Sequence, residues 1–271
     1  MSSPAERPES APQEAAAIVK RERDARGVVT LTLNRPQAFN ALSEALMASL
    51  QRELDALETD HSARVVVVAG AGKAFCAGHD LREMRAKPSL EYYQRLFTQC
   101  SQMMLTLRRL PIPVIARVHG IATAAGCQLV AQCDLAVAAS DARFAVSGVN
   151  LGLFCSTPAV PLSRNVPLKQ AFEMLVTGDF IDAEEARERG LVNRVVAPQA
   201  LDAEVEKLVA GILRKPRVAI ALGKELFYRQ SELPLAAAYE AASRTIAGNM
   251  MESVALEGVQ AFIDKRAPRW E

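Results

Sequence analysis

The chain has 271 residues, of which half are apolar and 23% are charged, the balance of an ordinary globular protein. Its formal net charge of +1 excludes a general electrostatic attraction to nucleic acid or to an anionic membrane. The five cysteines form no CxxC pair and indicate reduced thiols, with no metal site. No apolar stretch reaches the roughly 18 residues of a membrane span.

Residues 1–17 are expected to form a disordered tail, because three prolines and three glutamates lie between Ser2 and Ala15. This segment lacks the apolar core of a signal peptide, and its acidic residues argue against a mitochondrial transit peptide. A cytoplasmic location is therefore expected.

The first half of the chain alternates strand and helix patterns. The run VVTLTL over residues 28–33 predicts a strand that ends before Pro36. Ser43 is a candidate N-cap for a helix with leucines at helical spacing, and the run VVVVA over residues 65–69 predicts a strand buried on both faces. Further strands are expected near residues 113–118 and 134–139. This alternation predicts an α/β core with parallel pairing over residues 18–215.

The second half ends in helices alone. A capping box at residues 182–185 predicts a helix that stops before Gly190. From residue 216 to 271 the pattern is only helical, with helices expected at residues 219–228 and 234–263. Such a segment has few partners in its own chain, so this region is predicted to dock on neighbouring subunits.

Residues 69–81 read AGAGKAFCAGHDL and follow a predicted strand. The first two glycines are typical of a dinucleotide loop, but Phe75 stands where the third glycine should be, and no GK[ST] follows. Both nucleotide-loop interpretations fail, which leaves a small-residue turn that packs a helix on a strand.

Residues 119–140 contain a second run of small residues, at positions 122 and 124–126, where a strand ends and a helix begins. The N–H groups of a helix N-terminus can stabilise developing negative charge. Close helix packing also requires small residues, and the spacing leaves both interpretations open.

Four segments in order, LNRPQAFNAL (33–42), KAFCAGHDL (73–81), AAGCQLVAQCDLAVA (124–138) and AFIDKRAP (261–268), resemble motifs of the crotonase (enoyl-CoA hydratase/isomerase) superfamily. The runs at 122–131 and 148–158 most resemble the animal enoyl-CoA hydratase domain-containing protein 3 group. The resemblance implies an α/β crotonase spiral of ββα units with a C-terminal helical trimerisation region. It also implies a homotrimer or homohexamer.

The resemblance further implies that the backbone N–H groups of His79 and Ala125 form an oxyanion hole around a thioester carbonyl. The ligand would be an acyl-coenzyme A thioester, with no permanently bound cofactor and no metal. Coenzyme A contacts are expected from one loop, at Ala77, His79, Asp80, Leu81 and Arg82, and from the basic residues Arg35 and Lys265. Lys265 would reach in from a neighbouring subunit. Arginine and lysine suit phosphate by charge and donor geometry, although each could equally be solvated surface charge.

The catalytic acids of the family are missing. Gln128 and Gly148 occupy the positions of the two hydratase glutamates, and Ser156 occupies the position of an isomerase acid. General acid–base catalysis requires a titratable group, which none of the three supplies. The His79 imidazole and the Cys155 thiol are the remaining candidates, although a buried cysteine is more often a small apolar residue.

Two classes of function follow. The first is an enzyme of fatty acyl-CoA metabolism: a weak or repurposed hydratase, or a lyase, decarboxylase or thioesterase that uses another group. The second is a non-catalytic protein that sequesters acyl-CoA.

Overall fold

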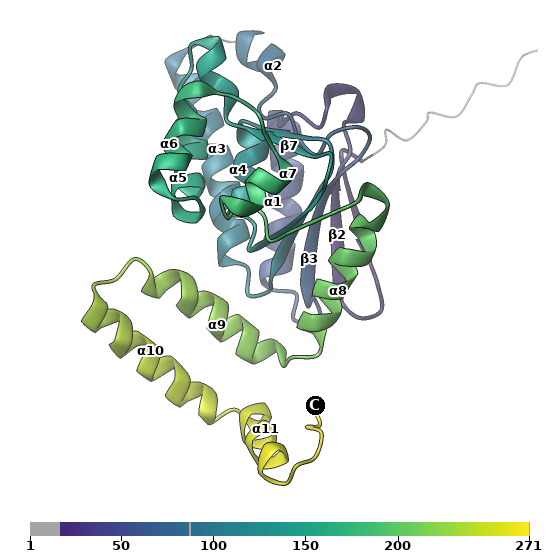
Figure 1. Ribbon diagram of the computed structural model, residues 1–271, viewed down its shortest axis with the longest axis vertical. Helices are drawn as coiled ribbons and strands as arrows, with labels where there is room; N and C mark the ends of the chain where they lie inside the picture. Colours follow the sequence, from purple (N-terminus) through teal and green to yellow (C-terminus); the bar gives the residue numbers. More distant parts are fainter. Residues whose placement is uncertain (1–16, 87, 271) are drawn as a thin grey trace, which may run out of the picture.

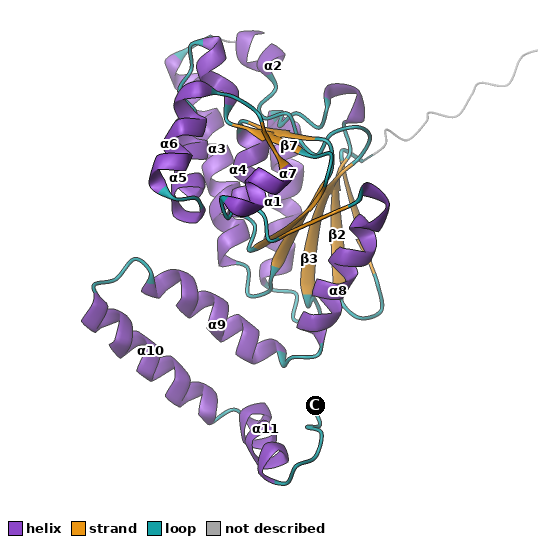
Figure 2. Cartoon of the chain, in the orientation of Figure 1, coloured by secondary structure: helices purple, strands orange, loops and turns teal. Residues whose placement is uncertain are grey.

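The computed structural model describes residues 17–86 and 88–270, so the predicted tail lies outside the described residues apart from its last residue. An α/β body is followed by three helices that extend away from it (Figure 1). Figure 2 shows a sheet flanked by helices in that body. Among the described residues, no helix combines the length and apolar character needed to cross a bilayer.

The main sheet has six strands, in the order β1 (Val19–Arg23), β2 (Val28–Leu33), β3 (Val65–Gly70), β4 (Val114–Val118), β6 (Leu135–Ala139) and β9 (Arg194–Val196). Every pair from β2 onward is parallel, as the alternation of strands and helices predicts. Strand β1 pairs antiparallel with β2 and is absent from the sequence prediction. Only the first residue of β1 is buried, so this edge strand carries no apolar alternation that could reveal it.

The two faces of the sheet pack on different helices, because alternate strand residues point to opposite sides. Val29, Leu31 and Leu33 face a large core with α1 (Glu44–Glu58), α3 (Leu90–Arg109) and α4 (Ala125–Gln132). Val28 and Val67 belong to a second, smaller core under α8 (Leu201–Leu213). The body is thus a sheet between two unequal helical layers.

A second sheet of three strands lies beside the N-terminus of α4: β5 (Ile121–Thr123), β7 (Arg143–Ala145) and β8 (Ile181–Asp182). The remaining helices of the body are α2 (Leu81–Ala86), α5 (Ser156–Asn165), α6 (Leu168–Thr177) and α7 (Ala183–Glu188).

The two helix N-caps that the sequence indicates are confirmed. The Ser43 hydroxyl accepts a hydrogen bond from the Leu46 N–H at the start of α1, at 3.2 Å. The Asp182 carboxylate accepts from the Glu185 N–H at 2.9 Å and caps α7. Gly190 follows that helix with a φ of 80°, a conformation that glycine adopts without strain.

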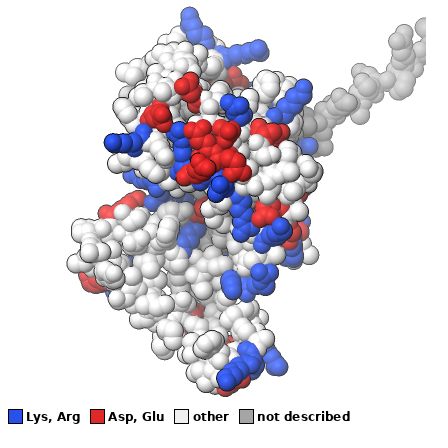
Figure 3. Space-filling view, viewed as in Figure 1, with Lys and Arg blue, Asp and Glu red and all other residues white. Residues whose placement is uncertain are grey.

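The C-terminal region contains α9 (Arg217–Gln230), α10 (Leu235–Met250) and α11 (Ser253–Ile263). The prediction of a single helix over residues 234–263 is wrong, because Glu252 is extended and occupies the N-cap position of a new helix. These helices expose large apolar side chains, including Leu235, Tyr239, Met251 and Phe262. Figure 3 shows a mostly uncharged surface over α9 and α10.

A buried ion pair ties α9 to the body. The Lys224 ammonium lies 2.7 Å from the Asp134 carboxylate, with the two side chains 7% and 13% exposed. It also donates to the carbonyls of Leu107 and Ile112, while the Tyr228 hydroxyl donates to Asp134 at 2.7 Å. Burial lowers the pKa of Lys224, although Asp134 opposes that shift. The charge is tolerated because each of the three N–H groups of the ammonium has an acceptor.

We expect Lys224→Met to lower the free energy of unfolding by about 3 kcal/mol, because Asp134 keeps its charge without its cation. Arg229→Met is the matched control, since among the described residues Arg229 pairs only with Glu225, on the surface of the same helix. Its free energy of unfolding should fall by about 0.5 kcal/mol or less. Urea unfolding followed by circular dichroism measures both. An equal decrease in the free energy of unfolding in the two variants would show that the buried pair does not anchor α9.

Candidate functional site

Two backbone segments, residues 76–79 and 121–126, pass close to each other. The Cys76 N–H donates to the Ile121 carbonyl at 3.1 Å, and the Thr123 N–H donates to the Cys76 carbonyl at 3.0 Å. A Cβ atom at Gly126 would lie only 2.1 Å from the Cys76 oxygen. Close packing therefore explains why position 126 is a glycine. The same packing brings the start of α4 next to the 76–79 loop.

Ala124 turns the chain from β5 into α4 with an unusual backbone, at φ 49° and ψ −119°. A non-glycine residue in such a region carries a strain of about 1–3 kcal/mol. Two hydrogen bonds hold it: its N–H donates to the Ala145 carbonyl at 2.9 Å, and its carbonyl accepts from the Gln128 N–H at 3.0 Å. The turn leaves the Ala125 N–H at the first position of the helix.

The peptide between Gly78 and His79 has a fixed orientation. Its carbonyl accepts a hydrogen bond from the Leu42 N–H at 2.7 Å, and the Asp80 N–H returns a bond to the Leu42 carbonyl at 3.1 Å. The peptide is trans, so its N–H points away from Leu42. A Cβ atom on Gly78 would lie 3.2 Å from the Ala125 nitrogen, which places the two loops in contact. Within the described part of the chain, neither the His79 N–H nor the Ala125 N–H has an acceptor.

The His79 ring packs edge-on against Phe97, with 5.2 Å between the ring centroids. Its Nε2 atom is buried and has no hydrogen-bond partner among the described residues. Burial lowers the pKa of His79 to about 4. The imidazole is therefore neutral at pH 7 and poorly matched to general acid–base work at that pH.

Gln128 lies on α4 one turn after Ala125 and is 3% exposed. Its Oε1 atom is buried and meets no donor in the described residues. A helical side chain covers the turn that precedes it, which here is the turn at 124–125. The amide can thus hydrogen-bond a water or a polar ligand group, but it cannot take up a proton.

Gly148 is closed to a side chain. A Cβ atom there would lie 2.6 Å from the Leu153 carbonyl oxygen and 2.8 Å from the Cys155 sulfur. The Gly148 N–H donates to that sulfur at 3.3 Å. Burial raises the pKa of Cys155, although this N–H opposes the shift. The thiol is therefore protonated near pH 7, which makes it a poor nucleophile.

Three hydroxyl groups, those of Ser156, Thr123 and Ser147, lie near Gly148 and the Ala124 turn in the sequence or in the structure. Ser156 begins α5 as an exposed residue, and its hydroxyl donates to the Phe154 carbonyl at 3.3 Å. The hydroxyls of Thr123 and Ser147 lie 2.9 Å apart beside the Ala124 turn. Sequence reasoning missed this pair, because the two residues come together only through the pairing of β5 with β7.

The predicted coenzyme A contacts on the loop lie together. The Ala77 N–H donates to the Phe39 carbonyl at 3.0 Å, and Asp80 accepts from the Arg82 N–H at the start of α2. Leu81 and Arg82 are exposed, and Arg82 has no ion-pair partner among the described residues. Lys265 lies just after α11, at the opposite end of the molecule from α2 (Figure 1).

Arg35 is held within the protein. Its guanidinium donates to the Ala41 carbonyl at 2.8 Å and to the Asp80 carboxylate at 3.0 Å. Next to it, Asn40 is fully buried with a φ of 55°. The Asn40 amide nitrogen lies within hydrogen-bond distance of the carbonyls of Ala71, Ala74 and Phe75. Sequence reasoning did not identify Asn40, although it lies within the motif at 33–42.

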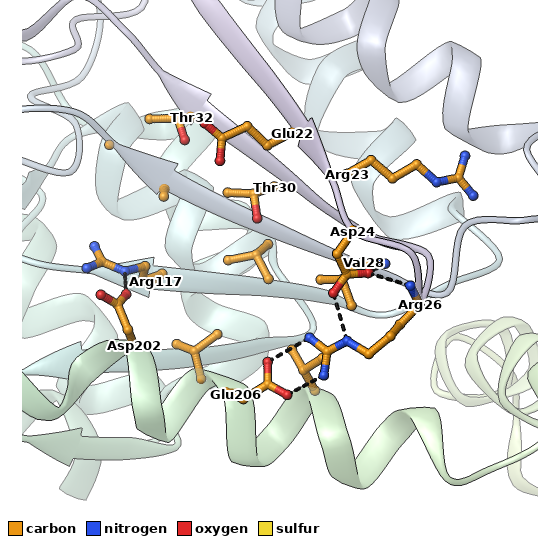
Figure 4. Close-up of a pocket in the computed structure, with 15 residues that line it drawn as sticks. Glu22, Arg23, Asp24, Arg26, Val28, Thr30, Thr32, Arg117, Asp202 and Glu206 are labelled. Atoms are coloured by element: carbon orange, nitrogen blue, oxygen red, sulfur yellow. Dashed lines mark hydrogen bonds and ion pairs between the residues drawn. The ribbon is translucent and has the colours of Figure 1, made fainter.

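A groove of about 490 Å³ lies on the other face of the sheet, between β2 and α8 (Figure 4). Val28, Val67 and Val205 contribute to its lining, and all three belong to the smaller core. Its three arginines are all paired: Arg117 with Asp202, Arg26 with Glu206 and Arg23 with Asp60. The sheet separates this groove from the two unpaired amides, so it is not part of the candidate site.

Residues 23–271 match the model of the enoyl-CoA hydratase/isomerase family. The chain is 43% identical over 244 residues to a mitochondrial enoyl-CoA hydratase domain-containing protein 3 from Xenopus laevis. That match covers 90% of this chain and 83% of the relative. The human protein of the same name is 41% identical to this chain, and the match covers 90% of this chain and 80% of that relative.

Solved structures agree with this relationship. The structure of an enoyl-CoA hydratase from Mycobacterium smegmatis is 65% identical with a TM-score of 0.93, and the match covers 94% of this chain and 99% of that one. Human enoyl-CoA hydratase domain-containing protein 3 is 40% identical with a TM-score of 0.90, and the coverages are 94% and 100%. The predicted crotonase fold and the resemblance to that group are confirmed.

The expectation of a cytoplasmic location is contradicted, because these Xenopus and human relatives are named as mitochondrial proteins. That expectation rested on the composition of residues 1–17, which lie almost entirely outside the described residues.

The buried imidazole predicts a pH dependence of stability. The folded-state pKa of His79 is about 4 against an ordinary value of 6.5, so only the unfolded chain gains this proton between those values. Stability is therefore lost as the pH falls from about 6.5 towards 4. We expect wild type to lose about 2 kcal/mol more than His79→Gln between pH 8 and pH 5, measured by urea unfolding. Parallel pH profiles for the two proteins would contradict this assignment.

Proposed function

The chain belongs to the enoyl-CoA hydratase/isomerase family, and from this membership we propose that it binds acyl-coenzyme A thioesters and polarises their carbonyl group. The observation that supports the proposal is that, among the described residues, the N–H groups of His79 and Ala125 have no acceptor and lie on two loops in contact. Negative charge develops on a thioester oxygen when the carbonyl is attacked or when the neighbouring carbon loses a proton. Preorganised donors in a dry site stabilise that charge by several kcal/mol.

Hydration of an enoyl thioester by this protein is slow. Gln128 can orient a water molecule but cannot take its proton, and no side chain fits at Gly148. The neutral His79 imidazole and the protonated Cys155 thiol are poor replacements. A non-catalytic acyl-CoA binder is the second candidate, and the closed space at Gly148 is the observation that favours it.

Coenzyme A lies along the 77–82 loop in this proposal, with Arg82 as the exposed cation beside its phosphates. Lys265 joins the site from a neighbouring subunit, because in its own chain it lies at the far end of the C-terminal helices. The site is then complete only in an assembly, a trimer or a hexamer.

We expect wild type to hydrate crotonyl-CoA at less than about 1 per second, below the usual range of enzyme turnover. Butyryl-CoA should nevertheless bind with a calorimetric signal. Gln128→Glu restores one carboxylate without a change of shape and should raise the rate by about tenfold or more, since a general acid or base contributes about 10²–10⁴-fold.

Gly148→Glu is the companion variant and should fail to restore activity. Its side chain would have to displace the Leu153 carbonyl, so a lower melting temperature is expected. A wild-type turnover in the hundreds per second would show that another residue performs the acid–base step. Failure to bind butyryl-CoA would contradict the proposed function itself.

We expect the 271-residue chain to be a trimer or hexamer, because α9 to α11 expose large apolar side chains. Light scattering should therefore report three or six times the chain mass of 29.3 kDa. Phe262→Asp places a charge at a side chain that is 85% exposed in the single chain and should reduce that mass. A wild-type protein that is monomeric at micromolar concentration would rule out a shared site.

A further inference from the structure

We propose that Arg35 is a positioning residue of the oxyanion hole, acting on the His79 N–H through two consecutive peptide groups; this inference rests on the proposed function. Sequence resemblance suggests a phosphate contact for Arg35, but its hydrogen bonds lead elsewhere.

The two peptide groups form a chain of hydrogen bonds. The Arg35 guanidinium donates to the Ala41 carbonyl at 2.8 Å. The N–H of that same peptide belongs to Leu42, and it donates to the Gly78 carbonyl at 2.7 Å. The N–H of the next peptide belongs to His79. A positive charge at one end of such a chain polarises each peptide in turn, which strengthens the last donor.

The chain also fixes an orientation. Gly78 has a φ of +88°, and glycine allows a peptide to rotate with little steric resistance. If the Gly78–His79 peptide turned over, its carbonyl would lose the Leu42 N–H and would point towards Ala125. The bond from Leu42 therefore selects the orientation in which the His79 N–H faces the site.

Arg35 and its neighbours hold Leu42 in place. The second guanidinium nitrogen donates to Asp80 at 3.0 Å, so the arginine clamps both sides of the Leu42–His79 contact. Asn40 accepts from the Arg35 N–H at 2.9 Å through its side-chain oxygen and binds the 71–75 loop through its nitrogen. Burial disfavours the Asp80 charge, but Arg35 and the amides of Glu83 and Arg82 outweigh it and keep the pKa of Asp80 below its ordinary value.

Arg82 provides the contrast. It is exposed, it lies in the first turn of α2, and within the described chain it has no acidic partner. A phosphate could therefore bind it without breaking an existing contact. Arg35 already uses both of its terminal nitrogens, for Ala41 and for Asp80, and its side chain is only 22% exposed, which leaves fewer donors for a phosphate.

Two probes separate these roles. Butyryl-CoA and its thioether analogue S-butyl-CoA share the nucleotide and the alkyl chain, and only the first has a carbonyl. The ratio of their dissociation constants reports the oxyanion hole alone. We expect wild type to bind the thioester about tenfold more tightly. The stretching frequency of a ¹³C-labelled thioester carbonyl, measured by infrared difference spectroscopy, gives a second readout of the same hydrogen bonds.

Arg35→Met should lower that ratio to about threefold or less and shift the carbonyl band back towards its frequency in water, while S-butyl-CoA binds as before. Arg35→Lys retains the charge and should recover part of both signals. In Arg82→Met both ligands should weaken by the same factor, with the band unchanged. Melting curves check that each variant is folded, and Arg35→Lys carries the test if Arg35→Met is not.

Equal weakening of both ligands in Arg35→Met, with an unshifted band, would overturn the inference and make Arg35 a phosphate contact. An unchanged ratio and band would overturn it as well. If wild type binds neither ligand, the proposed function fails before this inference is reached. If wild type binds both equally, the oxyanion hole itself is absent.

Discussion

The hydrogen bond from the Leu42 N–H to the Gly78 carbonyl is the interaction on which the site depends. It joins the segment before α1 to the loop after β3, and it decides which way the Gly78–His79 peptide faces. The close approach of Gly126 to Cys76 then brings the start of α4 to the same place. Both contacts are made by the backbone. A residue at these positions must therefore have a suitable size and backbone conformation, and its side-chain chemistry matters less. Histidine at 79 and alanine at 125 are both compatible with this backbone arrangement.

Sequence patterns predicted the elements that depend on local chemistry or on full burial. Ser43 and Asp182 cap their helices, and the valine run from Val65 forms a central strand. The motifs also pointed to the two loops that carry the His79 and Ala125 N–H groups, which the structure brings into contact. They could not show that Asn40 binds three carbonyls from residues 71–75, because that contact spans more than thirty positions. They could not show the closure of Gly148 either, since the atoms that fill its space come from Leu153 and Cys155 after a turn.

At Ala124, backbone strain is offset by hydrogen bonds to neighbouring elements. A glycine would adopt its backbone freely, whereas alanine is strained there. Two backbone hydrogen bonds, to β7 and to the first turn of α4, hold the residue in that conformation. These hydrogen bonds offset the strain energy, and they also fix the orientation of the Ala125 N–H. A local pattern of small residues cannot distinguish this turn from an ordinary helix start, because the strain arises only when β5, β7 and α4 meet.

The four candidate catalytic positions near the two amides have one property in common: none of their side chains is charged at neutral pH. The His79 imidazole is kept neutral by burial, the Cys155 thiol is kept protonated, Gln128 is an amide, and Gly148 has no side chain. Such a site can stabilise negative charge on a carbonyl oxygen through fixed dipoles, but it has no group that exchanges a proton near pH 7. Burial also makes a new charge expensive, and the buried Gln128 Oε1 meets no donor among the described residues, so a carboxylate at this position needs donors supplied by water or by the ligand.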